Sequence, residues 1–354
     1  MFPERNRLGR CSCMPTPSLF GCKLIANKVV RRFLRLGGIE QMLKNNRHDL
    51  VSAQQLDTEA VLHQIKLATA FQNGLQIKLR RPVYAMNLFF ENSTRTHTSF
   101  EMAEQRLGIG VIGFQASDSS MTKGESLLDT LKTIQAIGVD LAVIRHSKNA
   151  YYEPILAEQL TLSLINAGDG SGEHPSQSLL DMMTINQAFG HFSGLKVGII
   201  GDIAHSRVAR SNAELLTKLG ARVAFAGPDS WFPAEFSQFG PHVTVDEIVD
   251  QADVVMLLRV QHERLSTEME EGFDASEYHE RFGLTSERVE QLHPQTIIMH
   301  PGPVNRGVEI DSDLVESPHS RIFQQMSNGM YMRMAIIADI LSAKNLIEPI
   351  ELGA

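Results

Sequence analysis

Four consecutive small polar or cationic residues, Ser93, Thr94, Arg95 and Thr96, follow an apolar run that ends at Phe90. Hydroxyls at the start of a helix are usually caps, because they accept hydrogen bonds from the free N–H groups of the first turn. A guanidinium there is repelled by the positive end of the helix dipole unless an anion lies between them. Hydroxyls, free N–H groups and a guanidinium that converge form a phosphate-binding site. We therefore predict a phosphate site here, with a capped helix and a solvated arginine as the alternative.

Polar and basic residues also follow several other apolar runs that are typical of buried strands. They are Arg145 and His146, the run 166–172, Gly201 and Asp202, Arg259, and the run 300–303. In open parallel sheets, ligands bind at the carboxyl ends of the strands. We therefore expect these residues to meet at one active site.

The elements that must position these residues are predicted from the periodicity of apolar residues. Strands are expected at 84–90, 110–114, 141–145, 162–166, 195–200, 221–226, 254–258 and 296–299. Helices are expected between them, with further helices at 56–75 and 328–341. Strand–helix alternation indicates parallel sheets with helices on both faces. The predicted fold class is α/β, with two doubly wound parallel-sheet domains linked by helices.

The size and charge of the chain narrow the class of protein. A chain of 354 residues allows two domains, each with its own core. No apolar run approaches the roughly 20 residues of a membrane span, so no membrane partner is expected. The net charge of −8 argues against nucleic acid as a partner, because nonspecific binding needs a basic face. An anionic substrate is compatible with this charge, since clustered arginines create a local positive field.

Residues 1–41 form a basic N-terminal extension. They hold eight Lys/Arg and two Asp/Glu, a net of +6, which leaves −14 for the remainder. All three cysteines lie there, so the main body has no thiol chemistry or disulfide, and a cytoplasmic location is expected. The alternatives are a transit peptide, a disordered tail and a start codon assigned too far upstream. The last is favoured because Met42 precedes the recognisable motifs.

No cofactor and no metal are expected. Cys11 and Cys13 alone are too few ligands for a metal site. The run 197–202 superficially resembles a dinucleotide-binding turn, but G-x-G-x-x-G is missing and two arginines occupy the start of the next helix.

The run Phe89-Phe90-Glu91-Asn92-Ser93-Thr94-Arg95-Thr96 resembles the carbamoyl-phosphate loop of the aspartate and ornithine carbamoyltransferase family. The similarity extends from about residue 42 to about residue 345. It implies a carbamoyl-phosphate-binding domain made of residues 42–175 and a C-terminal helix at 329–354. It also implies an aspartate-binding domain at 176–328.

This resemblance implies a set of ligands for carbamoyl phosphate. The phosphate ligands would be Ser93, Thr94, Arg95, Thr96 and Arg145. His174 would donate a hydrogen bond to the carbamoyl oxygen, while the side-chain carbonyl of Gln177 would accept one from the carbamoyl NH2. Arg95, Thr96 and His174 would stabilise the developing oxyanion and are the predicted catalytic residues.

Two loops complete this predicted carbamoyl-phosphate site. The backbone carbonyls of Pro301 and Gly302 would accept hydrogen bonds from the carbamoyl NH2 and the attacking amine, and the bond from Gly302 to Pro303 is a candidate cis peptide. From the residue types alone, we would predict a surface turn at 119–125. In the family, this loop reaches into the neighbouring subunit, where Ser119 and Lys123 would contact the substrates. The resemblance thus implies a homotrimer with shared active sites.

The second substrate implied by the resemblance is L-aspartate. Arg207 would bind its α-carboxylate and Arg259 its side-chain carboxylate, with Gln261 and Lys123 also in the aspartate site. The reaction would give N-carbamoyl-L-aspartate and phosphate, a step towards pyrimidines. The alternative is transfer to ornithine or another amine, but the family's ornithine enzymes have His-Cys-Leu-Pro where this chain has His-Pro-Gly-Pro. Whether regulatory chains or a dihydroorotase bind stays open.

Two positions depart from the family pattern. His97 replaces a usual arginine, which puts substrate affinity and pH dependence in doubt. Ser176 replaces a usual threonine, a change that keeps the hydroxyl.

Overall fold

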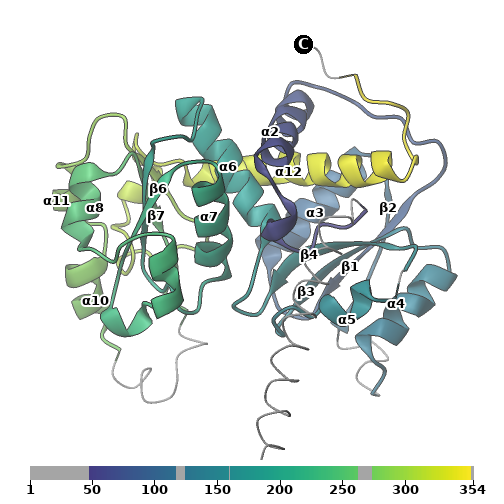
Figure 1. The fold of residues 1–354 in the computed structure, drawn as a ribbon, viewed down its shortest axis with the longest axis horizontal. Helices are drawn as coiled ribbons and strands as arrows, with labels where there is room; N and C mark the ends of the chain where they lie inside the picture. The colour runs from purple at the N-terminus through teal and green to yellow at the C-terminus, as the bar shows by residue number, and fades with distance from the viewer. Residues whose placement is uncertain (1–47, 117–123, 159, 262–272, 352–354) are drawn as a thin grey trace, which may run out of the picture. The chain divides into compact units, whose positions relative to one another are not determined.

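Two parallel four-stranded sheets form the framework of the chain in the computed structural model, which describes residues 48–116, 124–158, 160–261 and 273–351 (Figure 1). The first sheet has the order β2-β1-β3-β4 and the second has the order β6-β5-β7-β8. The strands of the first sheet are β1 (Tyr84–Phe89), β2 (Gly110–Ile112), β3 (Leu141–His146) and β4 (Ser163–Asp169). Those of the second are β5 (Lys196–Ile200), β6 (Arg222–Ala226), β7 (Val254–Leu257) and β8 (Ile297–Met299). The predicted α/β fold with two parallel sheets is confirmed.

Helices connect successive strands, as parallel pairing requires. They are α3 (Thr94–Arg106), α4 (Leu127–Ala136), α5 (Glu153–Leu156), α6 (Pro175–Phe189), α7 (Arg207–Lys218), α8 (Val245–Gln251), α10 (Ala275–Phe282) and α11 (Ser286–Val289). Two further helices lie outside the strands, because α2 (Thr58–Gln72) precedes β1 and α12 (Ile322–Ala343) follows β8. Local sequence explains several ends. Pro175 begins α6, where its missing N–H costs nothing, and Gly190 ends it with a left-handed φ of 74°.

The register of the first sheet brings its functional residues to one edge. Phe89 lies opposite Arg145 on β3, and His146 pairs with Asp169 at the end of β4. The side chains that follow β1, β3 and β4 therefore start from neighbouring points.

The last helix differs from its prediction, because it begins at Ile322 rather than at residue 328. Ser327, Asn328 and Gly329 are typical turn residues, but here they lie inside the helix. A Cβ at Gly329 would lie 2.6 Å from Nη1 of Arg333, so glycine serves close packing there. The predicted domain boundaries, which divide the chain at 175 and 329, stay a prediction.

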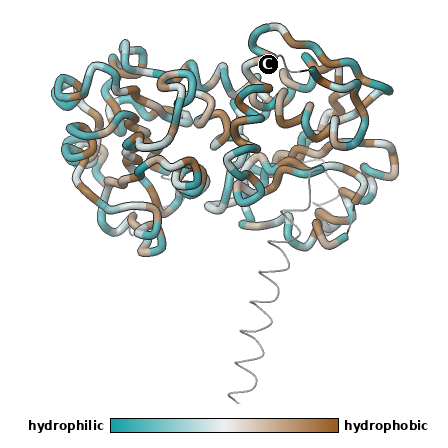
Figure 2. Tube along the Cα trace, turned by 45° about the horizontal axis from the view of Figure 1, so that its top comes forward, coloured by the Kyte–Doolittle hydropathy of each residue, from teal (hydrophilic) through white to brown (hydrophobic). Residues whose placement is uncertain are grey.

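One hydrophobic cluster contains residues of both sheets and of the helices between them. It includes Val143 of β3, Leu179 of α6, Ile199 of β5 and Ile337 of α12. Figure 2 shows hydrophobic residues along the inner segments and hydrophilic residues on the outer turns. Helices α6 and α12 pack against each other.

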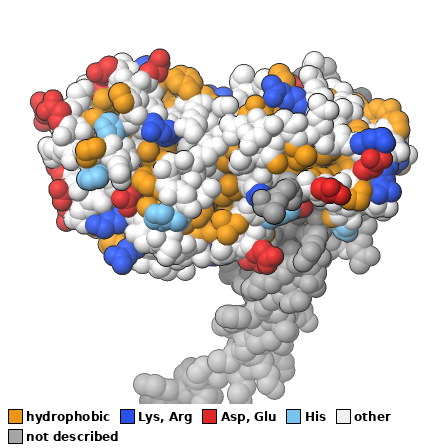
Figure 3. Space-filling model, turned by 90° about the horizontal axis from the view of Figure 1, so that it is seen from above, with side chains coloured by type: hydrophobic (Ala, Val, Ile, Leu, Met, Phe, Trp, Pro, Cys, Tyr) orange, Lys and Arg blue, Asp and Glu red, His pale blue; other side chains and the backbone are white. Residues whose placement is uncertain are grey.

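None of the helices in the described ranges combines the length and apolarity that a bilayer span demands. On the face drawn in Figure 3, acidic and basic side chains are interspersed among hydrophobic ones, so that face has no extended basic patch.

Candidate active site

A cavity of about 1150 Å³ lies where loops from both sheets converge. Most of the residues predicted from the sequence line it together: Ser93, Thr94, Arg95, Thr96, Arg145, His174, Gln177, Arg207, Arg259, Gln261, Pro301 and Gly302. Ser119 and Lys123 lie outside the described residues. The structure therefore brings together every described residue that the family resemblance implied. Some residues that were expected at the site because they follow strands do not line the cavity: His146, the run 166–172, Gly201, Asp202 and His300.

The N-terminus of α3 forms one wall of the cavity. Ser93 is the N-cap residue by position, yet its side chain makes no capping hydrogen bond to the first turn. Capping therefore does not account for this hydroxyl. Thr96 is buried, and Arg95 has a lowered pKa because of its burial and the nearby positive charge of Arg259. A multiply charged anion at this point would relieve that repulsion.

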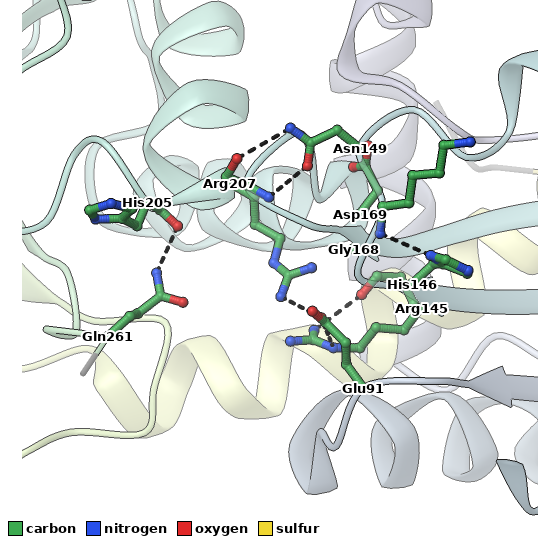
Figure 4. A network of polar contacts seen from close by, with 12 residues as sticks. Glu91, Arg145, His146, Asn149, Gly168, Asp169, His205, Arg207 and Gln261 are labelled. Atoms are coloured by element: carbon green, nitrogen blue, oxygen red, sulfur yellow. Dashed lines mark hydrogen bonds and ion pairs between the residues drawn. The ribbon is translucent and has the colours of Figure 1, made fainter. Parts of the chain in front are cut away.

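Glu91 connects the two sheets through a pair of arginines (Figure 4). Its Oε2 lies 2.8 Å from Nη2 of Arg207 and 3.4 Å from Nε of Arg145. The side chain of Arg207 is only 7% exposed, and its Nη1 has no hydrogen-bond partner among the described residues. Arg145 also donates to the carbonyl oxygen of Ala167, at 3.3 Å. Both guanidinium groups thus face the cavity from fixed positions.

The close approach of these arginines depends on Gly168 in β4. Its φ is +121°, and a Cβ there would lie 2.8 Å from Nη1 of Arg207 and 3.3 Å from Nη1 of Arg145. A glycine is therefore favoured at position 168, because a side chain there would clash with both arginines.

His174 lies at the start of α6 with its ring buried. Burial, followed by the charges of Arg145 and Arg207, lowers its pKa well below the ordinary value, so the ring is neutral. Its Nδ1 lies 3.5 Å from the Ser176 hydroxyl, and its backbone N–H donates to Oγ of Ser211. If the hydroxyl donates to Nδ1, the proton lies on Nε2, which can then donate to a ligand.

The opposite wall comes from the second sheet. Arg259 follows β7, and Gln261 donates from Nε2 to the carbonyl oxygen of His205 at 2.9 Å, so its side chain ties two loops together. The Gly302–Pro303 peptide is cis, as predicted. Nδ1 of His300 accepts the N–H of Gly302 at 2.9 Å, while burial lowers the pKa of His300 to about 3 and keeps the ring neutral.

His97, the departure from the family pattern, does not line the cavity. Its ring packs edge-on against Phe89 with centroids 4.8 Å apart, and its Nδ1 lies 3.5 Å from Oε2 of Glu101. The side chain thus contributes to the packing of α3 on β1.

Three residues that line the cavity have roles that the sequence did not suggest: Glu91, Gln325 and Arg333. Glu91 is part of the recognised motif, but nothing local indicates that it reaches two arginines. Arg333 interrupts an apolar helix, and a buried cation is an anomaly that could have signalled a site. The described lining thus contains five arginines and one carboxylate.

The described residues include no group of three or more His, Cys, Asp or Glu arranged to hold a metal ion. A two-sheet α/β protein with a phosphate-type cradle facing two further arginines defines a class of protein with room for two anionic ligands at one site.

Comparison with known proteins shows to which family the chain belongs. A family model described as "Aspartate/ornithine carbamoyltransferase, carbamoyl-P binding domain" matches residues 48–187. A second, described as "Aspartate/ornithine carbamoyltransferase, Asp/Orn binding domain", matches residues 193–340. The chain therefore belongs to the aspartate/ornithine carbamoyltransferase family.

Individual relatives are similar over nearly their whole length. The aspartate carbamoyltransferase catalytic subunit of Lactiplantibacillus plantarum is 61% identical over 299 residues, covering 84% of this chain and 96% of the relative. That of Pediococcus pentosaceus is 60% identical over 303 residues, covering 86% and 98%. The solved aspartate transcarbamoylase of Trypanosoma cruzi with carbamoyl phosphate and aspartate is 30% identical, with a TM-score of 0.72 and coverage of 82% and 95%.

Proposed function

We propose that this chain transfers the carbamoyl group of carbamoyl phosphate to the α-amine of L-aspartate, giving N-carbamoyl-L-aspartate and phosphate, a step towards pyrimidines. The observation that carries the proposal is one cavity in which the α3 N-terminus faces Arg207 and Arg259. A phosphorylated substrate and a dicarboxylate would each find cationic partners there.

Carbamoyl phosphate would lie against α3. In this pose, its phosphate group accepts hydrogen bonds from Ser93, Thr94, Thr96 and the guanidinium groups of Arg95 and Arg145. The neutral ring of His174 donates to the carbamoyl oxygen. The side-chain carbonyl of Gln177 and the backbone carbonyls of Pro301 and Gly302 receive the carbamoyl NH2 and the incoming amine.

Aspartate would lie between Arg207 and Arg259, with one carboxylate on each. Guanidinium groups bind carboxylates through two parallel hydrogen bonds, which also orient the amine. Ornithine would place a cationic side chain near Arg259, so the same charge that favours aspartate disfavours ornithine. The relatives at 55–61% identity are named as aspartate enzymes, which supports this choice.

The chemistry would be a direct displacement. The uncharged amine attacks the carbamoyl carbon, the new C–N bond forms, and the C–O bond to phosphate breaks with its electron pair leaving on phosphate. The amine nitrogen loses one proton, which the departing phosphate takes up. Arg95, Thr96 and His174 stabilise the oxyanion between these events. Orientation of two anions that repel each other in water supplies much of the rate enhancement.

The proposal includes a cytoplasmic homotrimer. The location follows from the restriction of cysteines to the first 41 residues. The trimer is what the family resemblance implies for the loop containing Ser119 and Lys123, which would complete the site of a neighbouring subunit.

Carbamoylation by the purified protein, with aspartate and ornithine offered separately, tests the function. Product with aspartate alone is the expected result.

The variant Arg259→Ala should raise KM for aspartate by about two orders of magnitude, because two charge-assisted hydrogen bonds are lost. The control Arg281→Ala removes an exposed arginine outside the cavity and should have no effect. Product with ornithine, or an unchanged KM in Arg259→Ala, would contradict the assignment.

A further inference from the structure

Asp181 is a buried carboxylate directly behind the cavity wall. It lies on α6 and is fully buried. Its Oδ1 accepts hydrogen bonds from Nε2 of Gln177 and from Nε2 of Gln325, each at 2.9 Å. Its Oδ2 accepts one from Nδ2 of Asn212 at 2.8 Å. Each oxygen therefore serves a different set of partners.

The chemistry of a carboxylate determines how the two glutamine amides point. An ionised carboxylate can only accept hydrogen bonds, so both glutamines must turn their NH2 groups towards Asp181. Their carbonyl oxygens then point the other way. Because Gln177 lines the cavity, its carbonyl oxygen is left as an acceptor for a ligand's N–H.

Gln325, the second glutamine, is oriented in the same way and connects Asp181 to the opposite wall of the cavity. Oε1 of Gln325 accepts the backbone N–H of His300 at 2.8 Å. The His300 ring in turn accepts the N–H of Gly302 at 2.9 Å. A chain of hydrogen bonds through Gln325 and His300 thus connects Oδ1 of Asp181 to the loop of Pro301 and Gly302, which line the cavity.

We propose that Asp181 is a positioning residue that orients the acceptors for the carbamoyl NH2, directly through Gln177 and indirectly through Gln325 and the His300–Gly302 loop. This inference rests on the proposed function. The phosphate cradle on α3 makes none of these hydrogen bonds. Asp181 should therefore affect recognition of the carbamoyl group and leave phosphate binding unchanged.

The two oxygens of Asp181 provide a matched pair of variants. Asp181→Leu removes the acceptor for both glutamines. Asn212→Leu removes the partner of the other oxygen at an equally buried position. The charged group that faces Asp181 from α12 is Arg333, and neither variant replaces it.

The test measures kcat/KM for carbamoyl phosphate together with inhibition by inorganic phosphate. In Asp181→Leu, kcat/KM should fall about 100-fold, as when a preorganised polar contact is lost, while the inhibition constant of phosphate stays at the wild-type value. In Asn212→Leu, both quantities should stay near wild type. Equal losses in both variants, or a parallel loss of phosphate affinity, would show that Asp181 has only a structural role.

Two further variants keep the test decisive if Asp181→Leu does not fold. Asp181→Asn can keep an oxygen towards the glutamines, because Oδ1 of Asn212 has no partner among the described residues and this amide can reverse. It should retain most activity. Gln325→Met breaks only the connection to His300 and should lower kcat/KM with unchanged phosphate inhibition. An Asn variant as inactive as a Leu variant, or a fully active Gln325→Met, would overturn the inference.

The wild-type protein separates the two possible failures. Wild-type protein that gives no product with aspartate contradicts the proposed function itself. Active wild-type protein with an unaffected Asp181→Leu contradicts only the positioning role.

Discussion

The described side chains that line the cavity include five arginines and one carboxylate, that of Glu91. Burial and the neighbouring Arg259 lower the pKa of Arg95, and burial lowers the pKa of Arg333 to about 10. Such shifts mean that burial and like charge make the charged forms of these two arginines less favourable. Glu91 offsets part of the positive charge through its ion pair with Arg207 at 2.8 Å.

Glu91→Gln is expected to weaken the use of aspartate. The ion-paired hydrogen bond of 2.8 Å to Arg207 is replaced by a weaker one to an uncharged amide oxygen, so the guanidinium is held less firmly. We expect kcat/KM for aspartate to fall about tenfold, the cost of one such bond. Steady-state kinetics check this, with Glu235→Gln, which disrupts an exposed pair with Arg210, as the control. An unchanged value for Glu91→Gln would show that Arg207 is oriented by other contacts.

Glu104 should make the stability of the folded protein depend on pH. Burial raises its pKa to about 8 from an ordinary 4.5, although Asn87 donates to it at 2.8 Å. Between these values the folded state keeps the proton and the unfolded state has lost it. Stability therefore falls as pH rises through this window.

Glu104→Gln should remove this dependence, since glutamine is neutral at every pH. The unfolding free energy of the variant relative to wild type should grow by about 1.4 kcal/mol per pH unit between the two pKa values. Denaturant unfolding at several pH values measures it, and Glu59→Gln, at an exposed site on α2, is the control. A difference in unfolding free energy between Glu104→Gln and wild type that does not change with pH would show that Glu104 does not carry this proton.

At the scale of elements, the close approach of two arginines to the end of β4 depends on Gly168. Gly168→Ala should lower kcat/KM about 100-fold, because a Cβ at this point displaces both arginines from their productive positions. Gly194→Ala is the matched control, since Gly194 also has a positive φ, of 83°, but has nothing within 4 Å of its Cβ position. Comparable losses of activity in both variants would attribute the effect to backbone strain alone.

The helices differ in how far local sequence predicts them. Helix α3 begins at Thr94, inside the polar run from Ser93 to Thr96 that marks its start in the sequence. Helix α12 contains Ser327, Asn328 and Gly329, which suggest a turn, and its true start was missed by six residues. Packing against α2, α3 and α6 supplies the stability that local propensity lacks there.

At the scale of the whole molecule, the proposed trimer predicts complementation between inactive variants. Lys123→Ala would damage a neighbour's site, whereas Arg145→Ala damages its own. Mixed trimers would contain one intact site each, so unfolding and refolding the two together should restore about a quarter of wild-type activity. Each variant refolded alone is the control. Mixed trimers without activity would argue against shared sites.

The sequence by itself determined the α/β fold and the strand order along the chain, and twelve residues predicted from it line the cavity. These features depend on short-range patterns: apolar periodicity, polar residues at strand ends, and motifs such as the run from Ser93 to Thr96. The tertiary structure decided which partners meet. Glu91 and Arg207 are 116 residues apart, and Asp181 and Gln325 are 144 apart. No local pattern encodes such pairs, because they form only when the loops of both sheets and α12 pack around α6.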